Sequence, residues 1–76
     1  MDYGPPAHDL ADPTPGELEA LRWTMDGMTS WEIGRKFDLS ERDVALRLER
    51  IMGKLNCGTK YEAVLKAIRL RLIVCN

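Results

Sequence analysis

The feature that most constrains the fold of this chain is a helix-start signal that occurs four times between residues 14 and 62. In this signal a Ser or Thr side chain accepts a hydrogen bond from the backbone of the third residue after it, and an acidic side chain at that residue bonds back. The pairs are Thr14 with Glu17, Thr29 with Glu32, Ser40 with Asp43, and Thr59 with Glu62. Pro15 strengthens the first signal, because proline is favoured at the first position of a helix. Four helices are therefore expected, over residues 15–26, 30–37, 41–55 and 60–71.

Apolar side chains recur at helical spacing in each of these segments, which is the pattern of a helix with one buried face. They are Leu18, Leu21 and Met25, then Ile33 and Phe37, then Val44, Leu48, Ile51, Met52 and Leu55, and finally Tyr61, Val64, Leu65, Ile68 and Leu72. Trp23 falls beside the first stripe and is expected to cover a core edge rather than to bind a cofactor. No strand pattern or repeat competes, so the expected fold class is all-α, a four-helix bundle.

The connection between the second and third predicted helices is very short. Only Asp38 and Leu39 precede Ser40, the cap of the third helix. Such a connection is typical of a helix-turn-helix, whose second helix enters a DNA groove. Glycine is common in this turn but absent here, so Asp38 is expected to take its conformational role. Gly27 and Asn56 are placed to end the first and third helices.

The domain organisation is simple, because 76 residues can hold one small hydrophobic core. Residues 1–13 contain three prolines and no apolar periodicity, so we expect a flexible lead-in or linker there and the folded domain over residues 14–76. His8 lies in the lead-in and is given no role. The longest apolar stretch, residues 72–75, is far shorter than the roughly 20 residues of a membrane span, and we expect no signal peptide and a soluble cytoplasmic protein.

Several classes of function find no support among the residues. Cys57, Cys75 and His8 cannot supply the four ligands of a structural zinc site, so free thiols are expected, with a redox pair as the less favoured alternative. The carboxylates are scattered over helix surfaces, and neither a nucleophile–base pair nor a glycine-rich phosphate loop is present. We therefore expect neither an enzyme nor a bound cofactor or metal.

The distribution of charge bears on the choice of partner. The net charge of -1 conceals -5 over residues 1–27, +1 over residues 28–59 and +3 over residues 60–76. A DNA-binding protein commonly has a basic face, because neutralising phosphates supplies much of its affinity. The second half of this chain has such an excess, although a modest one.

Three segments resemble a known family. They are TPGELEALRW, DGMTSWEIGRKFDLSERDV and IMGKLNCGTKYEAVLKAIRLRLI, which together span residues 14–73 without a gap. They resemble the LuxR/GerE-type helix-turn-helix domain of bacterial transcription regulators, and the RW and TSWEI variants are closest to its quorum-sensing branch. Gly16 stands where that family commonly has arginine.

The resemblance implies a sequence-specific DNA-binding domain with its third helix in the major groove of double-stranded DNA. The implied contacts are Ser30 and Trp31 at the backbone, Asp43, Ala45, Leu46, Arg47, Glu49 and Arg50 on the reading helix, and Lys54 near its end. Helical spacing independently places Arg42, Ala45, Leu46, Glu49, Arg50 and Gly53 on the face opposite the core.

The resemblance also implies partners of the last helix. It predicts a homodimer on a near-palindromic site, and the apolar side chains of that helix exceed what a core of this size can cover. The dimerisation residues are expected to be Tyr61, Val64, Leu65, Ile68 and Leu72. RNA polymerase and a related LuxR-type regulator are the further candidate partners.

Departures on the reading helix leave a second function open. Asp43 stands where the family often has threonine, and Glu49 where it often has a base-reading side chain, so two acids would face phosphates. Arg47 replaces the family's usual histidine. Glu49 can still accept from a cytosine amino group, and Leu46 can touch a thymine methyl. The alternative is a protein-interaction module of the same fold that has lost productive DNA contact and modulates a related regulator.

Single residues also have plainer interpretations. The bases Arg42, Arg47, Arg50 and Lys54 could form the solvated face of an amphipathic helix. Asp43 is most simply a capping residue, Glu49 a surface residue, and Trp31 either an indole donor to phosphate or a rim residue packed on the third helix.

Overall fold

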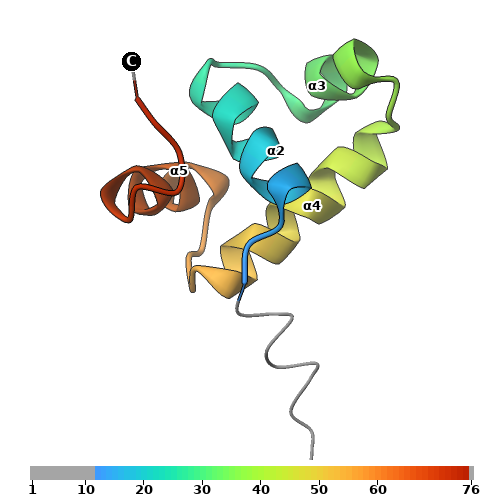
Figure 1. The fold of residues 1–76 in the computed structure, drawn as a ribbon. Helices are drawn as coiled ribbons and strands as arrows, with labels where there is room; N and C mark the ends of the chain where they lie inside the picture. Colours follow the sequence, from blue (N-terminus) through green and yellow to red (C-terminus); the bar gives the residue numbers. More distant parts are fainter. Residues whose placement is uncertain (1–11, 76) are drawn as a thin grey trace, which may run out of the picture.

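Hydroxyl side chains begin each helix in the part of the chain that the structure describes, as the repeated signal predicts. The computed structural model describes residues 12–75. Its helices are α2 (Pro15–Met25), α3 (Ser30–Phe37), α4 (Glu41–Lys54) and α5 (Lys60–Arg69), which confirms the all-α class and each predicted helix to within two residues at its ends. In Figure 1, α2 lies between α5 on one side and α3 with α4 on the other. The predicted lead-in lies outside the described residues, apart from Asp12 and Pro13.

Three of the four predicted capping boxes are complete. Thr14, Thr29 and Thr59 each accept from the backbone three residues later, and the glutamate at that position bonds back. The box at Ser40 is only half formed: its Oγ accepts from the Asp43 N–H at 3.0 Å, but no return bond from the Asp43 carboxylate is present. Aspartate is one methylene shorter than the glutamate or glutamine that closes such a box, so its carboxylate does not return to the cap.

Left-handed backbone ends the first three helices where the sequence predicts it. Gly27 has φ 90°, Asp38 φ 57° and Asn56 φ 59°. Asp38 therefore takes the role expected of a glycine in the turn, since a short polar side chain tolerates this region. Arg71 also has positive φ, at 62°, which no sequence signal indicated.

The glycine on which the turn between α3 and α4 depends lies inside α3. A Cβ on Gly34 would stand 2.6 Å from the Leu39 carbonyl oxygen. The Gly34 carbonyl also accepts from the Leu39 N–H at 2.8 Å. The turn therefore folds directly over a helix position that has no side chain.

The core lies where α2, α4 and α5 meet. Leu21, Val44 and Ile51 are completely buried, as predicted. The other buried apolar side chains are Ala20, Ile33, Leu48, Leu55, Ala63, Val64, Ala67 and Ile73. Small residues therefore fill the inner face of α5, while Leu18, Met25 and Ile68 are packed only partly against the core.

A buried ion pair joins the beginning of α2 to the end of α4. Lys54 Nζ lies 2.8 Å from Glu17 Oε1 and 2.9 Å from Oε2, and it donates to the Asp12 carbonyl at 2.9 Å. The side chains of Lys54 and Glu17 are only 5% and 4% exposed. Glu17 Oε1 also accepts from the Thr14 N–H, so one carboxylate both caps α2 and neutralises the lysine.

Within the described residues, no helix is long and apolar enough to cross a membrane. Over the same range, no group of three or more His, Cys, Asp and Glu side chains is arranged to hold a metal ion. Cys57 and Cys75 are both free thiols.

Candidate nucleic-acid interface

The outer face of α4 carries most of the predicted contact residues. Those exposed there are Arg42, Asp43, Leu46, Glu49 and Arg50, and Gly53 is exposed on the same face. Ala45 and Arg47 are half-buried at the edges of this face. The helix is held by its inner side chains and by the short turn from α3, so the outer face is presented as a rigid surface.

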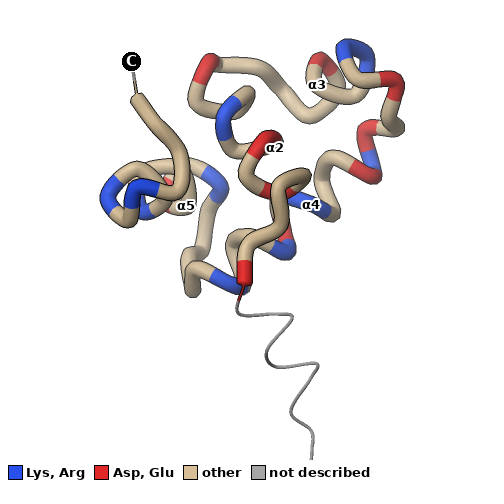
Figure 2. Tube along the Cα trace, in the orientation of Figure 1, with Lys and Arg blue, Asp and Glu red and all other residues tan. Residues whose placement is uncertain are grey.

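The charge on this face is mixed. Figure 2 shows Lys or Arg and Asp or Glu alternating along α4. Neither Arg42 nor Arg50 has an ion pair or hydrogen bond with another described residue, and the same holds for Glu49. These side chains are therefore available to an external partner, although the acids repel an approaching phosphate that the bases attract.

The start of α3 presents an aromatic side chain beside a base. Ser30 is half-buried, whereas Trp31 is 54% exposed and carries the Arg35 guanidinium 5.0 Å from its ring centroid. Trp31 is thus held by its own helix through a cation–π contact. The sequence interpretation missed Arg35, although a spacing of four residues on a helix signals this pairing.

Lys54 does not belong to this face. The sequence predicts a phosphate contact for it, but its ammonium group is turned inward and takes three acceptors from Glu17 and Asp12. The physical reason is the buried Glu17 carboxylate, which requires a cation in a region that water does not reach. The Lys54 ammonium group is therefore not available to a partner on the outer face of α4.

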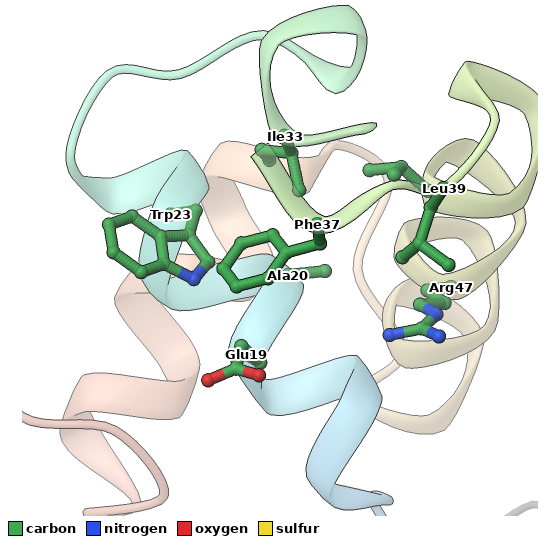
Figure 3. A pocket seen from close by; sticks show the side chains of 8 residues that line it. Glu19, Ala20, Trp23, Ile33, Phe37, Leu39 and Arg47 are labelled. Atoms are coloured by element: carbon green, nitrogen blue, oxygen red, sulfur yellow. The ribbon is translucent and has the colours of Figure 1, made fainter. Parts of the chain in front are cut away.

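Arg47 lies between α4 and the first turn of α2. A Cβ on Gly16 would stand 3.0 Å from Arg47 Nη1 and 3.4 Å from Cζ. Arg47 is also one of eight residues that line a hollow of about 200 Å³ between α2, α3 and α4, in which Figure 3 shows its guanidinium opposite Trp23 and Glu19. It therefore stands at the edge of the α4 face rather than at its centre.

Trp23 closes the other side of that hollow, as a residue covering the edge of the core. Its ring packs against Phe37 with centroids 5.4 Å apart, and Lys36 Nζ lies 4.3 Å from the indole centroid. The indole Nε1 is buried without a hydrogen-bond partner. The side chain thus serves packing between α2 and α3, as the sequence predicts.

One side of α5 and the turn after it carries exposed and half-buried apolar side chains. Tyr61 and Leu65 are 64% and 68% exposed, Ile68 and Leu72 are half-buried, and Val64 belongs to the core. The exposed members border a hollow of about 500 Å³ lined by Thr24, Met25, Gly27, Tyr61, Val64, Leu65, Ile68 and Cys75. Met25 and Cys75 were not among the predicted dimerisation residues, because only the tertiary structure brings them next to α5.

Comparison with known proteins agrees with this architecture. The model of the family described as bacterial regulatory proteins, luxR family, matches residues 14–67. The transcriptional activator protein AnoR of Acinetobacter nosocomialis is 44% identical over 57 residues, which cover 75% of this chain and 24% of that protein. The quorum sensing-dependent transcriptional regulator RpaR of Rhodopseudomonas palustris is 40% identical over 60 residues, 79% of this chain and 25% of that protein.

A third relative is the transcriptional activator protein LuxR of Aliivibrio fischeri, 36% identical over 64 residues that cover 84% of this chain and 26% of that protein. The chain therefore spans about a quarter of the length of these relatives. No solved structure gives a significant match.

Proposed function

The chain belongs to the luxR family of bacterial regulatory proteins and has its helix-turn-helix domain, and from this premise we propose that it binds double-stranded DNA with α4 in the major groove. The observation that carries the proposal is the outer face of α4. Arg42 and Arg50 stand exposed on it without a counter-charge from the described residues. The turn from α3 leaves this face unobstructed, which is the arrangement that places a recognition helix in a groove.

Different positions on the interface have different proposed roles. Arg50 and Arg42 supply donors for phosphates and guanine edges, which arginine meets with two parallel hydrogen bonds. Leu46, 46% exposed, offers an apolar contact to a thymine methyl, and Glu49 an acceptor for a cytosine amino group. Ser30 and Trp31 at the start of α3 are placed to meet the sugar-phosphate backbone.

The proposed assembly is a dimer through α5. A second copy would cover Tyr61 and Leu65, which otherwise leave an apolar surface in water. Two copies related by a two-fold axis would place two α4 helices on half-sites, so a near-palindromic site is expected.

A second candidate function rests on the acids of α4. Asp43 and Glu49 are exposed on the same face as the arginines and repel phosphates, while Leu46 offers an apolar contact to a protein. A domain with these features could pair with a related luxR-type regulator instead of DNA.

Binding-site selection from random duplexes, followed by fluorescence anisotropy at two salt concentrations, tests the two functions. DNA binding through phosphates weakens steeply as salt rises. We expect Arg50→Ala to weaken binding, and Arg22→Ala, an exposed arginine on α2, to leave it unchanged. Absence of binding to every duplex at low salt, together with salt-insensitive pairing with a related regulator, would favour the interaction module.

A further inference from the structure

Arg47 is a partly buried base without an internal partner. Among the described residues, the half-buried bases are Arg47, Lys54, Lys60 and Lys66. Lys54 pairs with Glu17, Lys66 donates to the Leu55 carbonyl at 2.8 Å, and Lys60 lies over a tyrosine ring. Arg47 has no hydrogen bond, ion pair or ring contact with any described residue. A guanidinium group that has lost part of its water and gained no acceptor favours an anion from outside.

The Arg47 guanidinium lies directly against residue 16, which has no side chain. Arg47 Nη1, Cζ and Nε all lie within 4 Å of the position of a Cβ on Gly16, at 3.0, 3.4 and 3.8 Å. Alanine at residue 16 would therefore require the guanidinium to shift by a few tenths of an ångström. Glycine is a weak helix former, so its presence in the first turn of α2 acts against the stability of that helix.

The guanidinium borders an open hollow, which we call the Arg47 notch. The notch has a volume of about 320 Å³ and is lined by Thr14, Gly16, Glu17, Asp43, Leu46, Arg47 and Arg50. The notch is open to solvent, and a hollow of this size leaves room for a phosphate group. The notch opens beside the outer face of α4, because Asp43, Leu46 and Arg50 are exposed there.

The charges that face the notch favour an anion. Arg47 and Arg50 supply two positive charges, and Asp43 supplies one negative charge. The Glu17 carboxylate also lines the notch, but Lys54 neutralises it at 2.8 Å. The remaining net charge is positive, because the exposed Asp43 offsets only one of the two positive charges.

We propose that the Arg47 notch holds a phosphate group, with the planar fork of the Arg47 guanidinium as its principal donor and Arg50 as a second donor. The proposal rests on the proposed function, in which this group is a phosphodiester of the DNA backbone beside the groove that α4 enters. Arg47 then positions the domain on the duplex and does not read a base. Gly16 is the positioning residue that keeps the guanidinium in place.

The first experiment uses inorganic phosphate as the probe, at constant ionic strength, with nuclear magnetic resonance of the ¹⁵N-labelled chain. Saturable shifts of the Arg47 Nε–H and Gly16 amide signals are expected. The Gly16 shift is expected to disappear in Arg47→Gln, and the Arg47 shift to weaken in Gly16→Ala. Gly58→Ala is the matched control, because residue 58 lies outside α4 and the notch, and the nearest atom to a Cβ there is Glu62 Oε1 at 3.4 Å.

The second experiment measures anisotropy on a random duplex as a function of salt. Arg47→Gln and Gly16→Ala are each expected to weaken binding, Arg47→Gln by roughly tenfold and with the salt slope smaller by about 1. The double variant should be no weaker than Arg47→Gln alone, because alanine at residue 16 acts only through Arg47. Arg47→Lys should recover the salt slope and only part of the affinity, since lysine keeps the charge and loses the fork. Circular dichroism melting of each variant excludes loss of folding as the cause.

The two experiments separate this proposal from the proposed function. Saturable phosphate shifts at Arg47 in a chain that binds no duplex would support the notch and contradict DNA binding. Duplex binding that is coupled at Gly16 and Arg47 without shifts from free phosphate would identify the DNA backbone as the source of the phosphate. Duplex binding that is unchanged in both variants would overturn the proposal while leaving the proposed function in place. If inorganic phosphate shifts the side-chain signal of Arg22 as much as that of Arg47, the shifts would reflect a non-specific charge effect and would contradict phosphate binding in the notch.

Discussion

Lys54 Nζ lies within 2.9 Å of both carboxylate oxygens of Glu17, across 37 residues of sequence and in a region almost closed to water. The same carboxylate closes the capping box of α2 through Thr14. Lys54 lies at the end of α4, the helix proposed to enter a DNA groove, yet its ion pair holds α2 and α4 together.

We expect Lys54→Met to lower the free energy of unfolding by about 3 to 5 kcal/mol, because it leaves the Glu17 carboxylate buried without a counter-charge. Glu17→Gln keeps a side-chain oxygen that can accept from the Thr14 N–H, but it leaves the Lys54 ammonium group without a counter-charge, so it should also destabilise. Urea unfolding followed by circular dichroism measures both. Arg22→Met is the control, because Arg22 is exposed and its side chain has no ion pair or hydrogen bond with another described residue, so its loss should change stability little. Equal effects of the substitutions at 54 and 22 would contradict the role assigned to the ion pair.

Gly34→Ala should destabilise the domain by about 1 to 3 kcal/mol, because the new methyl group would stand 2.6 Å from the Leu39 carbonyl oxygen and force the turn between α3 and α4 to move. Gly53→Ala is the control in α4, where nothing lies within 4 Å of the new Cβ. That change should stabilise by up to about 1 kcal/mol through helix propensity. Thermal unfolding of the two variants gives the comparison, and stabilisation by both would show that the turn tolerates a side chain at residue 34.

Glu49→Gln should tighten binding to an arbitrary duplex, because the exposed carboxylate on α4 repels phosphates. If Glu49 accepts from a cytosine amino group, the same change should cost on the order of 1 to 3 kcal/mol at one C·G position of a selected site. Anisotropy on both duplexes at low and moderate salt measures the two effects. In the interaction-module alternative, Glu49→Lys combined with Asp43→Thr should create DNA binding that the parent chain lacks. Unchanged affinity in every variant would mean that α4 does not face DNA.

Leu65→Asp should shift the chain toward the monomer without unfolding it, because Leu65 is 68% exposed on α5 and lines its apolar hollow. Leu70→Asp is the matched control, since Leu70 is 53% exposed and does not line that hollow. Sedimentation at high concentration compares both with the parent chain. A parent chain that sediments as a monomer, equal to Leu65→Asp, would remove the proposed two-fold contact. Ile68→Asp is a weaker test, because Ile68 is packed partly against the core and its loss also affects folding.

The limits and order of the helices could be predicted from the sequence because the interactions that define them are local. A capping hydroxyl reaches the backbone three residues later. A residue such as Asp38 adopts the left-handed region because its short polar side chain tolerates that conformation. The one capping box that did not close, at Ser40, failed for an equally local reason, the length of the aspartate side chain. The exposed face of α4 followed from helical periodicity in the same way.

The partners of individual side chains were decided by the tertiary structure. The sequence spacing around Lys54 does not indicate that its partner is Glu17, 37 residues earlier. The sequence around Gly16 likewise does not indicate that the Arg47 guanidinium packs against it. On α5, periodicity marks Val64 and Leu65 alike as apolar, but the packing of this helix on the core buries the valine and leaves the leucine in water. Local hydrogen bonds determine where a helix begins and ends, whereas the direction in which a charged or apolar side chain points depends on which other helix comes to lie beside it.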